Sequence, residues 1–315
     1  MTRIYLILIG VLLLILELII PQMVAKYQFI LFLVGILVLG IPHGAADLLI
    51  SLKITNDKKA RFSYLKFFLN YLGRLLFFLA IILVSPAIGV ILFIILASFH
   101  FGETDLYQFQ TDTITGKLFS VSYGLIILSV ILFFHFSEVK PLLMAFDAGK
   151  KFGYLINWID AYKITLLFLA LIQFYIFTFI YFISNKNNPK LDGTFLVNFL
   201  LIILILFCLP MLLGFTFYFV FWHSIISLQN ITQYLRHDLQ FSLKKLITQI
   251  SLYSLMAVIG VIIFGIFGIM FLNSNTIIIY ALMGLAVLTA PHMQIMHNMY
   301  HNIRLLEFSE NNSAI

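Results

Sequence analysis

The chain has few charged residues and almost no cysteine. Lysine, arginine, aspartate and glutamate make up 10% of its 315 residues, whereas soluble domains average about 25%. This scarcity excludes an ordinary soluble protein and, with 62% hydrophobic residues, predicts an integral membrane protein. The single cysteine, Cys208, lies in an apolar run, so neither a disulfide framework nor a thiolate metal site is expected.

Motifs of soluble enzymes are missing as well. The sequence offers no nucleotide-binding or soluble catalytic motif, no soluble domain and no long linker. The formal net charge is +6, but the basic residues are spread among short loops rather than gathered on one face. Nucleic acid is therefore not expected as a partner, and the lipid bilayer is.

Long apolar runs fill the chain. Spans of about 20 apolar residues mark candidate transmembrane helices, which we expect near 4–20, 27–51, 64–84, 86–101, 116–137, 162–184, 195–213, 214–235, 246–272 and 275–303. The joins at Ser85 and around Gly214 leave the number at nine or ten. The predicted fold class is all-α: one polytopic transmembrane domain over residues 1–315, with an interfacial amphipathic helix near 138–160.

The basic residues set the expected orientation in the membrane. A cytoplasmic N-terminus places most of them inside: Lys53, Lys58, Lys59, Arg61, Lys66, Lys117, Lys186, Lys190, Arg236, Lys244, Lys245 and Arg304. The outer side then holds Lys26 and an opposing cluster of Lys140, Lys150, Lys151 and Lys163. We expect a multi-pass protein of the inner cell membrane with both termini in the cytoplasm.

Four of the eight histidines lie inside apolar runs: His43 in IPHGAADLL, His100 in SFHFGETD, His223 in FWHSIIS and His292 in APHMQIMH. Polar groups at membrane depth usually face a bundle interior, where they bind or relay. The four helices run in the same direction in the expected topology, and a rise of about 1.5 Å per residue places these histidines within about 12 Å of one another in depth. Since neutral imidazole is a common ligand for iron, zinc and copper, the pattern indicates a metal site inside the membrane. The alternative is that each histidine only hydrogen-bonds to a neighbouring helix.

Carboxylates lie close to two of these histidines. Asp47 follows His43 by one helical turn, and Glu103 and Asp105 follow His100. Metal-bound histidines usually donate their second N–H to a carboxylate or carbonyl, so we expect these acids to orient the ligands. In a transporter the same acids would relay protons.

The remaining histidines and the nearby aromatic residues leave more than one interpretation open. His297 and His301 are four residues apart, which is ligand-like spacing, but a polar helix end is equally expected. His135 is interpreted as an interfacial residue and His237 as a solvated one. The aromatic neighbours of the buried histidines are candidates to line a substrate slot, or simply to pack: Phe99, Phe101, Tyr107, Phe221 and Trp222.

Together these segments resemble the Brp/Blh family, the bacterial and archaeal membrane enzymes that cleave β-carotene at its central double bond to give retinal. The matching pieces are PHGAAD at 42–47, FHFGETD at 99–105, FWHS at 221–224 and APHM at 290–293, in family order over nearly the whole chain. The resemblance implies a mononuclear iron(II) centre, with β-carotene and O2 as substrates and a functional link to a retinal-binding rhodopsin. It also implies that His43, His100 and His223 bind the metal, and His292 matches the family's proline-histidine segment.

One position departs from the family pattern. The family carries a second histidine one turn after its Trp-His, and this chain has Ser227 there. The fourth ligand is then expected to be His292 first and His297 second, with a three-histidine site completed by water as a further possibility. Two alternatives from other classes remain open: a b-type haem protein with two axial histidines, and a proton-coupled transporter that uses Asp47, Glu103 and the histidines.

Overall fold

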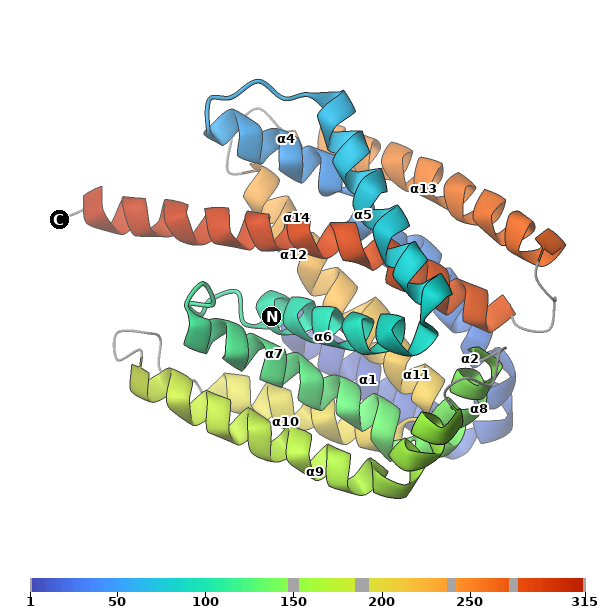
Figure 1. Cartoon of the computed structure of the whole chain (residues 1–315). Helices are drawn as coiled ribbons and strands as arrows, with labels where there is room; N and C mark the ends of the chain where they lie inside the picture. Colours follow the sequence, from blue (N-terminus) through green and yellow to red (C-terminus); the bar gives the residue numbers. More distant parts are fainter. Residues whose placement is uncertain (1, 147–152, 185–192, 237–241, 272–276, 314–315) are drawn as a thin grey trace. The chain divides into compact units, whose positions relative to one another are not determined.

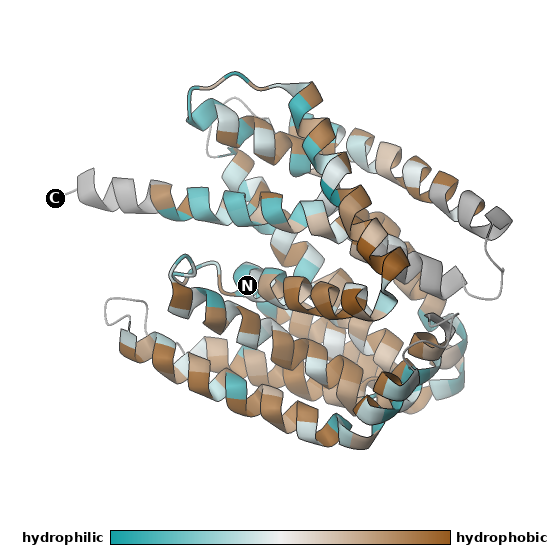
Figure 2. Ribbon diagram, viewed as in Figure 1, coloured by the Kyte–Doolittle hydropathy of each residue, from teal (hydrophilic) through white to brown (hydrophobic). Residues whose placement is uncertain are grey.

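The computed structural model describes residues 2–146, 153–184, 193–236, 242–271 and 277–313, and every element of secondary structure in them is a helix (Figure 1). Eight helices in these residues are long and apolar enough to cross a membrane. Apolar residues dominate most of the ribbons, as the brown colouring shows (Figure 2). The predicted all-α, polytopic membrane fold is confirmed.

The chain separates into two compact units. The first is made of Met1–Gly40 and Phe101–Ser227. Its complete elements are α1 (Thr2–Ile19), α2 (Pro21–Gly35), η1 (Ile36–Gly40), α7 (Ile114–Ser129), η2 (Val130–Phe134), α8 (Phe136–Phe146), α9 (Gly153–Ser184), α10 (Gly193–Cys208), α11 (Met211–Phe215) and η3 (Thr216–His223). The three η elements are π-helical.

The second unit is made of Ile41–His100 and Leu228–Ile315. It contains α3 (Ile41–Ala45), α4 (Asp47–Asp57), α5 (Tyr64–Val84), most of α6 (Pro86–Asp105), most of α12 (Ser224–Arg236), α13 (Leu243–Phe271) and α14 (Ile277–Ser313). Within this unit α14 packs against α4 and α5. The expectation of a single transmembrane domain stays a prediction.

Within the described residues each predicted apolar span lies mostly on helical structure, and the bounds of α5 are those predicted. The expected helix at 27–51 is divided into α2, η1, α3 and α4, because a π-helical segment and Pro42 interrupt it. In the region of the expected interfacial helix, α8 covers Phe136–Phe146 and α9 already begins at Gly153. His237, Lys150, Lys151, Lys186 and Lys190 lie outside the described residues.

Local sequence signals explain several helix starts. Ser63 caps α5 by accepting a hydrogen bond from the Lys66 N–H, and Thr113 caps α7 by accepting one from the Gly116 N–H. Pro21 and Pro86 are the first residues of α2 and α6, where a missing N–H costs nothing. These local signals mark where the four helices begin.

The first unit holds a close helix crossing and an aromatic core. A Cβ atom at Gly102 of α6 would overlap the backbone carbonyl of Ser120 on α7, so only glycine fits there. Next to Ser120 on α7, the Phe119 ring stacks on Tyr181 of α9 with a centroid separation of 4.8 Å. The Tyr181 hydroxyl in turn accepts a hydrogen bond from the Gln110 N–H at 3.0 Å. These contacts hold the end of α6 against α7 and α9.

A polar network ties together three helices of the second unit. The Asp57 carboxylate at the end of α4 accepts hydrogen bonds from the Tyr234 hydroxyl at 3.0 Å and from the Asn302 amide at 2.9 Å. Lys53, one turn earlier, lies 3.5 Å from the same carboxylate. The network fixes α4 against α12 and α14, and so fixes the helix that follows His43.

Candidate metal centre

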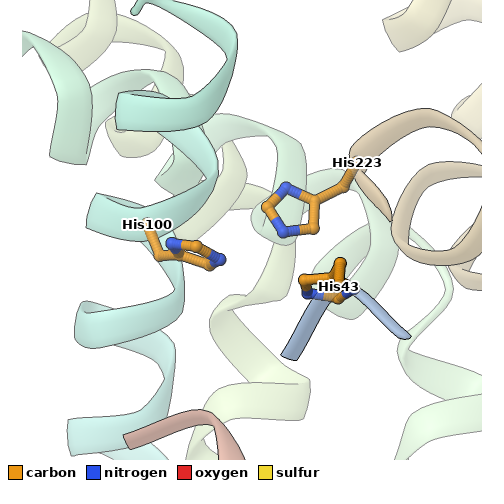
Figure 3. A group of neighbouring side chains, drawn as sticks. All are labelled: His43, His100 and His223. Atoms are coloured by element: carbon orange, nitrogen blue, oxygen red, sulfur yellow. The ribbon is translucent and has the colours of Figure 1, made fainter. Parts of the chain in front are cut away.

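Three of the four predicted ligand histidines come together. Nitrogen atoms of His43, His100 and His223 all lie within 4.8 Å of one another, and the three rings face one another (Figure 3). Their side chains are 4%, 1% and 0% exposed, respectively. Three converging imidazoles without a thiolate form a ligand set typical of iron, zinc or copper.

π-helical segments lead directly to two of these histidines. η1 ends at Gly40, three residues before His43, and η3 ends on His223 itself. η1 and η3 contact each other, and Gly35, just before η1, leaves room for Val220, because a Cβ there would lie 2.6 Å from a Val220 methyl group. An additional residue in a helical turn rotates the following side chains, and such segments are frequent at functional sites.

His292 adds a fourth imidazole beside two of the others. Its ring centroid lies 4.9 Å from that of His43 and 5.1 Å from that of His100, and its side chain is buried. Its Nδ1 lies 2.7 Å from an Asp47 carboxylate oxygen. Among the described residues its Nε2 has no hydrogen-bond partner. His292 therefore presents one nitrogen fixed by a carboxylate and one nitrogen available to a ligand.

The carboxylate that orients His292 is itself held in place. Asp47 is buried, and its second oxygen accepts a hydrogen bond from the Tyr71 hydroxyl of α5 at 3.2 Å. A carboxylate–histidine pair of this kind fixes the tautomer of a metal-binding histidine and raises its basicity. Asp47 was singled out because it follows His43 by one turn, and it contacts His292, 245 positions further along the chain.

Aromatic rings flank His223. The Phe101 ring centroid lies 4.7 Å from that of His223, and Phe219 stacks on the same imidazole at 6.0 Å with an interplanar angle of 15°. Both phenylalanines are buried. They limit the rotation of the imidazole and give it an apolar surrounding.

Asp105 is the centre of a second buried cluster, in the first unit. Its carboxylate accepts hydrogen bonds from the Tyr123 hydroxyl at 3.0 Å, the Tyr218 hydroxyl at 3.1 Å and the Trp222 indole N–H at 3.1 Å. The Arg3 guanidinium donates to the Asp105 backbone carbonyl at 2.9 Å. Asp105 thus holds Trp222, the residue before His223.

The other residues singled out from the sequence lie in varied surroundings. Glu103 is fully buried on α6, whereas Tyr107 is half-buried and accepts a hydrogen bond from Gln108. Phe99 and Phe221 are half-buried. The Phe99 ring centroid lies 5.4 Å from that of His297, which was expected as the alternative fourth ligand. The group of three converging histidines does not include His297. His135 forms a hydrogen bond with the Leu206 carbonyl at 2.9 Å.

Three tyrosines that support the cluster were not predicted. Tyr71 bonds to Asp47, and Tyr123 and Tyr218 bond to Asp105. Only Tyr218 gave a sequence signal, because it precedes Trp222 by four residues and so shares a helical face with it. Tyr71 and Tyr123 lie on helices whose register against the acids is fixed by tertiary packing.

The residues present fit a bound transition-metal ion. The converging nitrogens of three buried histidines are potential metal ligands, and the buried Nε2 of His292 has no hydrogen-bond partner among the described residues. An unsatisfied polar atom in an apolar interior is costly, and an unobserved ion is one of the accepted explanations for it. The donors are neutral nitrogens, which suit iron, zinc or copper rather than calcium or magnesium.

One family model matches most of the chain. No curated protein and no solved structure matches the chain. The family model described as beta-carotene 15,15'-dioxygenase matches residues 34–300, a range that contains all four buried histidines. The match covers most of the 315 residues, and so the chain belongs to the beta-carotene 15,15'-dioxygenase family.

Proposed function

We propose that this protein is a non-haem iron dioxygenase of the membrane that cleaves β-carotene at its central 15,15' double bond with O2 and releases two retinal molecules. Its family membership supports carotenoid oxidation, and its apolar helices suit a substrate dissolved in lipid. The observation that carries the iron site is His292, which lies against two other buried imidazoles while Asp47 holds its Nδ1. The retinal would be available to a retinal-binding rhodopsin.

The chain's own residues would hold iron through His43, His100, His223 and, as the fourth ligand, the Nε2 of His292. When bound, iron(II) supplies an open coordination position at which O2 becomes reactive toward an alkene. Asp47 keeps the proton of His292 on Nδ1, so that Nε2 carries the lone pair for the metal. Tyr71 keeps Asp47 in position for this task.

The overall reaction needs no proton donor. One C=C bond and the O=O bond break, and two C=O bonds form, so each retinal takes one oxygen atom and no external reductant is consumed. The absence of a proton donor from this balance agrees with the contacts of Asp47 and Asp105, whose carboxylates are bound to tyrosine, histidine and tryptophan donors.

β-Carotene would reach the site from the bilayer. Phe101 packs beside His223, and Phe99, Tyr107 and Phe221 are half-buried close to His100 and His223 in the sequence. We infer that these four rings guide the polyene, while Trp222, bonded to Asp105, holds the helix. An apolar surrounding also excludes water from the reacting carbons.

The test is expression in a bacterium that makes β-carotene, with the wild type compared with His223→Ala and, as a matched control, His135→Gln. We expect retinal and loss of orange colour with the wild type and the control, and neither with His223→Ala. Metal analysis and an absorption spectrum of each purified protein accompany the assay. A Soret band would favour a b-type haem protein. Folded protein without iron, but with proton-coupled transport, would favour a transporter.

A further inference from the structure

Ser227 lies one helical turn after His223 and is fully buried. Residues four apart on a helix share a face, so the Ser227 hydroxyl lies on the His223 side of α12. In the part of the chain that the structure describes, its Oγ has no hydrogen-bond partner. A buried hydroxyl without a partner is uncommon and points to a missing ligand or water.

Helical hydroxyls in this protein fall into two groups. Several bond to a backbone carbonyl four residues back, which is the usual way to satisfy them: Thr55 to Ser51, Ser98 to Ile94, Thr216 to Leu212, Thr248 to Lys244 and Ser254 to Ile250. Others have a buried hydroxyl without a partner among the described residues: Thr104, Ser120, Ser129, Thr178 and Ser227. Of these, Ser227 and Thr104 lie one turn after a histidine of the cluster. Ser224, next to His223, bonds to the Phe219 carbonyl at 2.8 Å. The Ser227 hydroxyl makes no such bond to its own helix and remains available to another acceptor.

The aromatic neighbours of His223 cannot hydrogen-bond to a ligand, whereas Ser227 can. Phe101 and Phe219 flank the imidazole and offer no hydrogen bond to a small molecule beside it. A neutral serine hydroxyl is a weak metal ligand, and its side chain is shorter than an imidazole. Ser227 therefore offers a single O–H donor on the His223 side of the helix.

We propose that Ser227 donates a hydrogen bond to a small exogenous ligand, such as water or an anion, that occupies an open coordination position of the metal held by His223. This inference rests on the proposed iron site and specifies its open position. Serine at this point makes the position accessible, whereas a longer ligating side chain would fill it. O2 would enter the site at the same position.

The experiment uses the full-length protein, freed of iron and reloaded with Co(II), whose visible absorption reports its ligands. Azide is the probe, because it binds open metal positions and accepts hydrogen bonds. We expect Ser227→Ala to retain Co(II) but to bind azide about tenfold more weakly, the effect of one lost hydrogen bond to an anion. Ser227→His should bind Co(II) more tightly and exclude azide.

Ser129→Ala is the matched control, because Ser129 on α7 is also buried with an unpartnered hydroxyl but has no histidine within a turn. Equal azide affinity in Ser227→Ala, Ser129→Ala and the wild type would overturn the role of Ser227 and leave the metal site standing. A wild-type protein that takes up no Co(II) would overturn the proposed metal centre itself.

Discussion

At the scale of single residues, His292 connects the histidine cluster to Asp47. Its ring contacts those of His43 and His100, and its Nδ1 is held by Asp47. The Tyr71 hydroxyl adds a further contact to Asp47. The chain of Tyr71, Asp47 and His292 therefore sets the direction in which the free Nε2 points.

Replacing Asp47 by asparagine tests this chain. We expect Asp47→Asn to lower the affinity for Co(II) by about 10–100-fold, because the loss of an orienting carboxylate makes the imidazole less basic. Tyr71→Phe should have a smaller effect in the same direction. The measurement is a Co(II) titration of the purified protein followed by absorption.

Asp57→Asn is the control for this prediction. Asp57 lies on the same helix as Asp47. It accepts hydrogen bonds from the Tyr234 hydroxyl and the Asn302 amide, whereas Asp47 contacts Tyr71 and His292. If Asp47→Asn and Asp57→Asn weaken Co(II) binding equally, Asp47 has only a general structural role.

At the scale of elements, α6 crosses α7 closely two residues after His100. Gly102, two residues after His100, lies against the Ser120 backbone, where a methyl group would collide with main-chain atoms. Gly102→Ala should therefore destabilise the protein by about 1–3 kcal/mol, the usual cost of overpacking. Thermal unfolding in detergent measures the change. Gly73→Ala on α5, with open space around its Cβ, should not lower the melting temperature and should raise it slightly, because alanine has the higher helix propensity.

The π-helical element η3 is held by the Asp105 cluster. Asp105→Ala would leave three buried donors, on Tyr123, Tyr218 and Trp222, without their acceptor, at a cost of about 1–3 kcal/mol for each donor left unsatisfied. Because Trp222 precedes His223, we expect weaker Co(II) binding as well as a lower melting temperature. Tyr123→Phe removes one donor and should do less of both. A destabilised Asp105→Ala protein with wild-type Co(II) affinity would contradict this role.

The elements also show what sequence alone can predict. Helix positions followed from apolar runs. A shared depth predicted that four histidines lie close together, and nitrogen atoms of His43, His100 and His223 lie within 4.8 Å of one another. The three π-helical segments were not predicted, because one additional residue in a turn leaves hydrophobic periodicity almost unchanged. The contacts of Asp47 with His292 and of Asp105 with Trp222 were missed, since both depend on which helices pack together.

At the scale of the whole molecule, the charge distribution predicts that both termini lie in the cytoplasm. Fusions of green fluorescent protein and of alkaline phosphatase to the C-terminus test this, because the first fluoresces in the cytoplasm and the second is active outside it. We expect fluorescence without phosphatase activity. Phosphatase activity at this end would mean that the outer lysines, among them Lys140 and Lys163, set the orientation instead.

The central claim is cleavage of β-carotene at its middle bond by an iron-loaded membrane protein. The most direct measurement supplies the purified, iron-loaded protein with β-carotene and O2 and identifies every aldehyde formed by mass spectrometry. The account predicts two retinal molecules for each β-carotene consumed and no fragments of unequal length. Unequal fragments, or unchanged β-carotene with folded and iron-loaded protein, would contradict it.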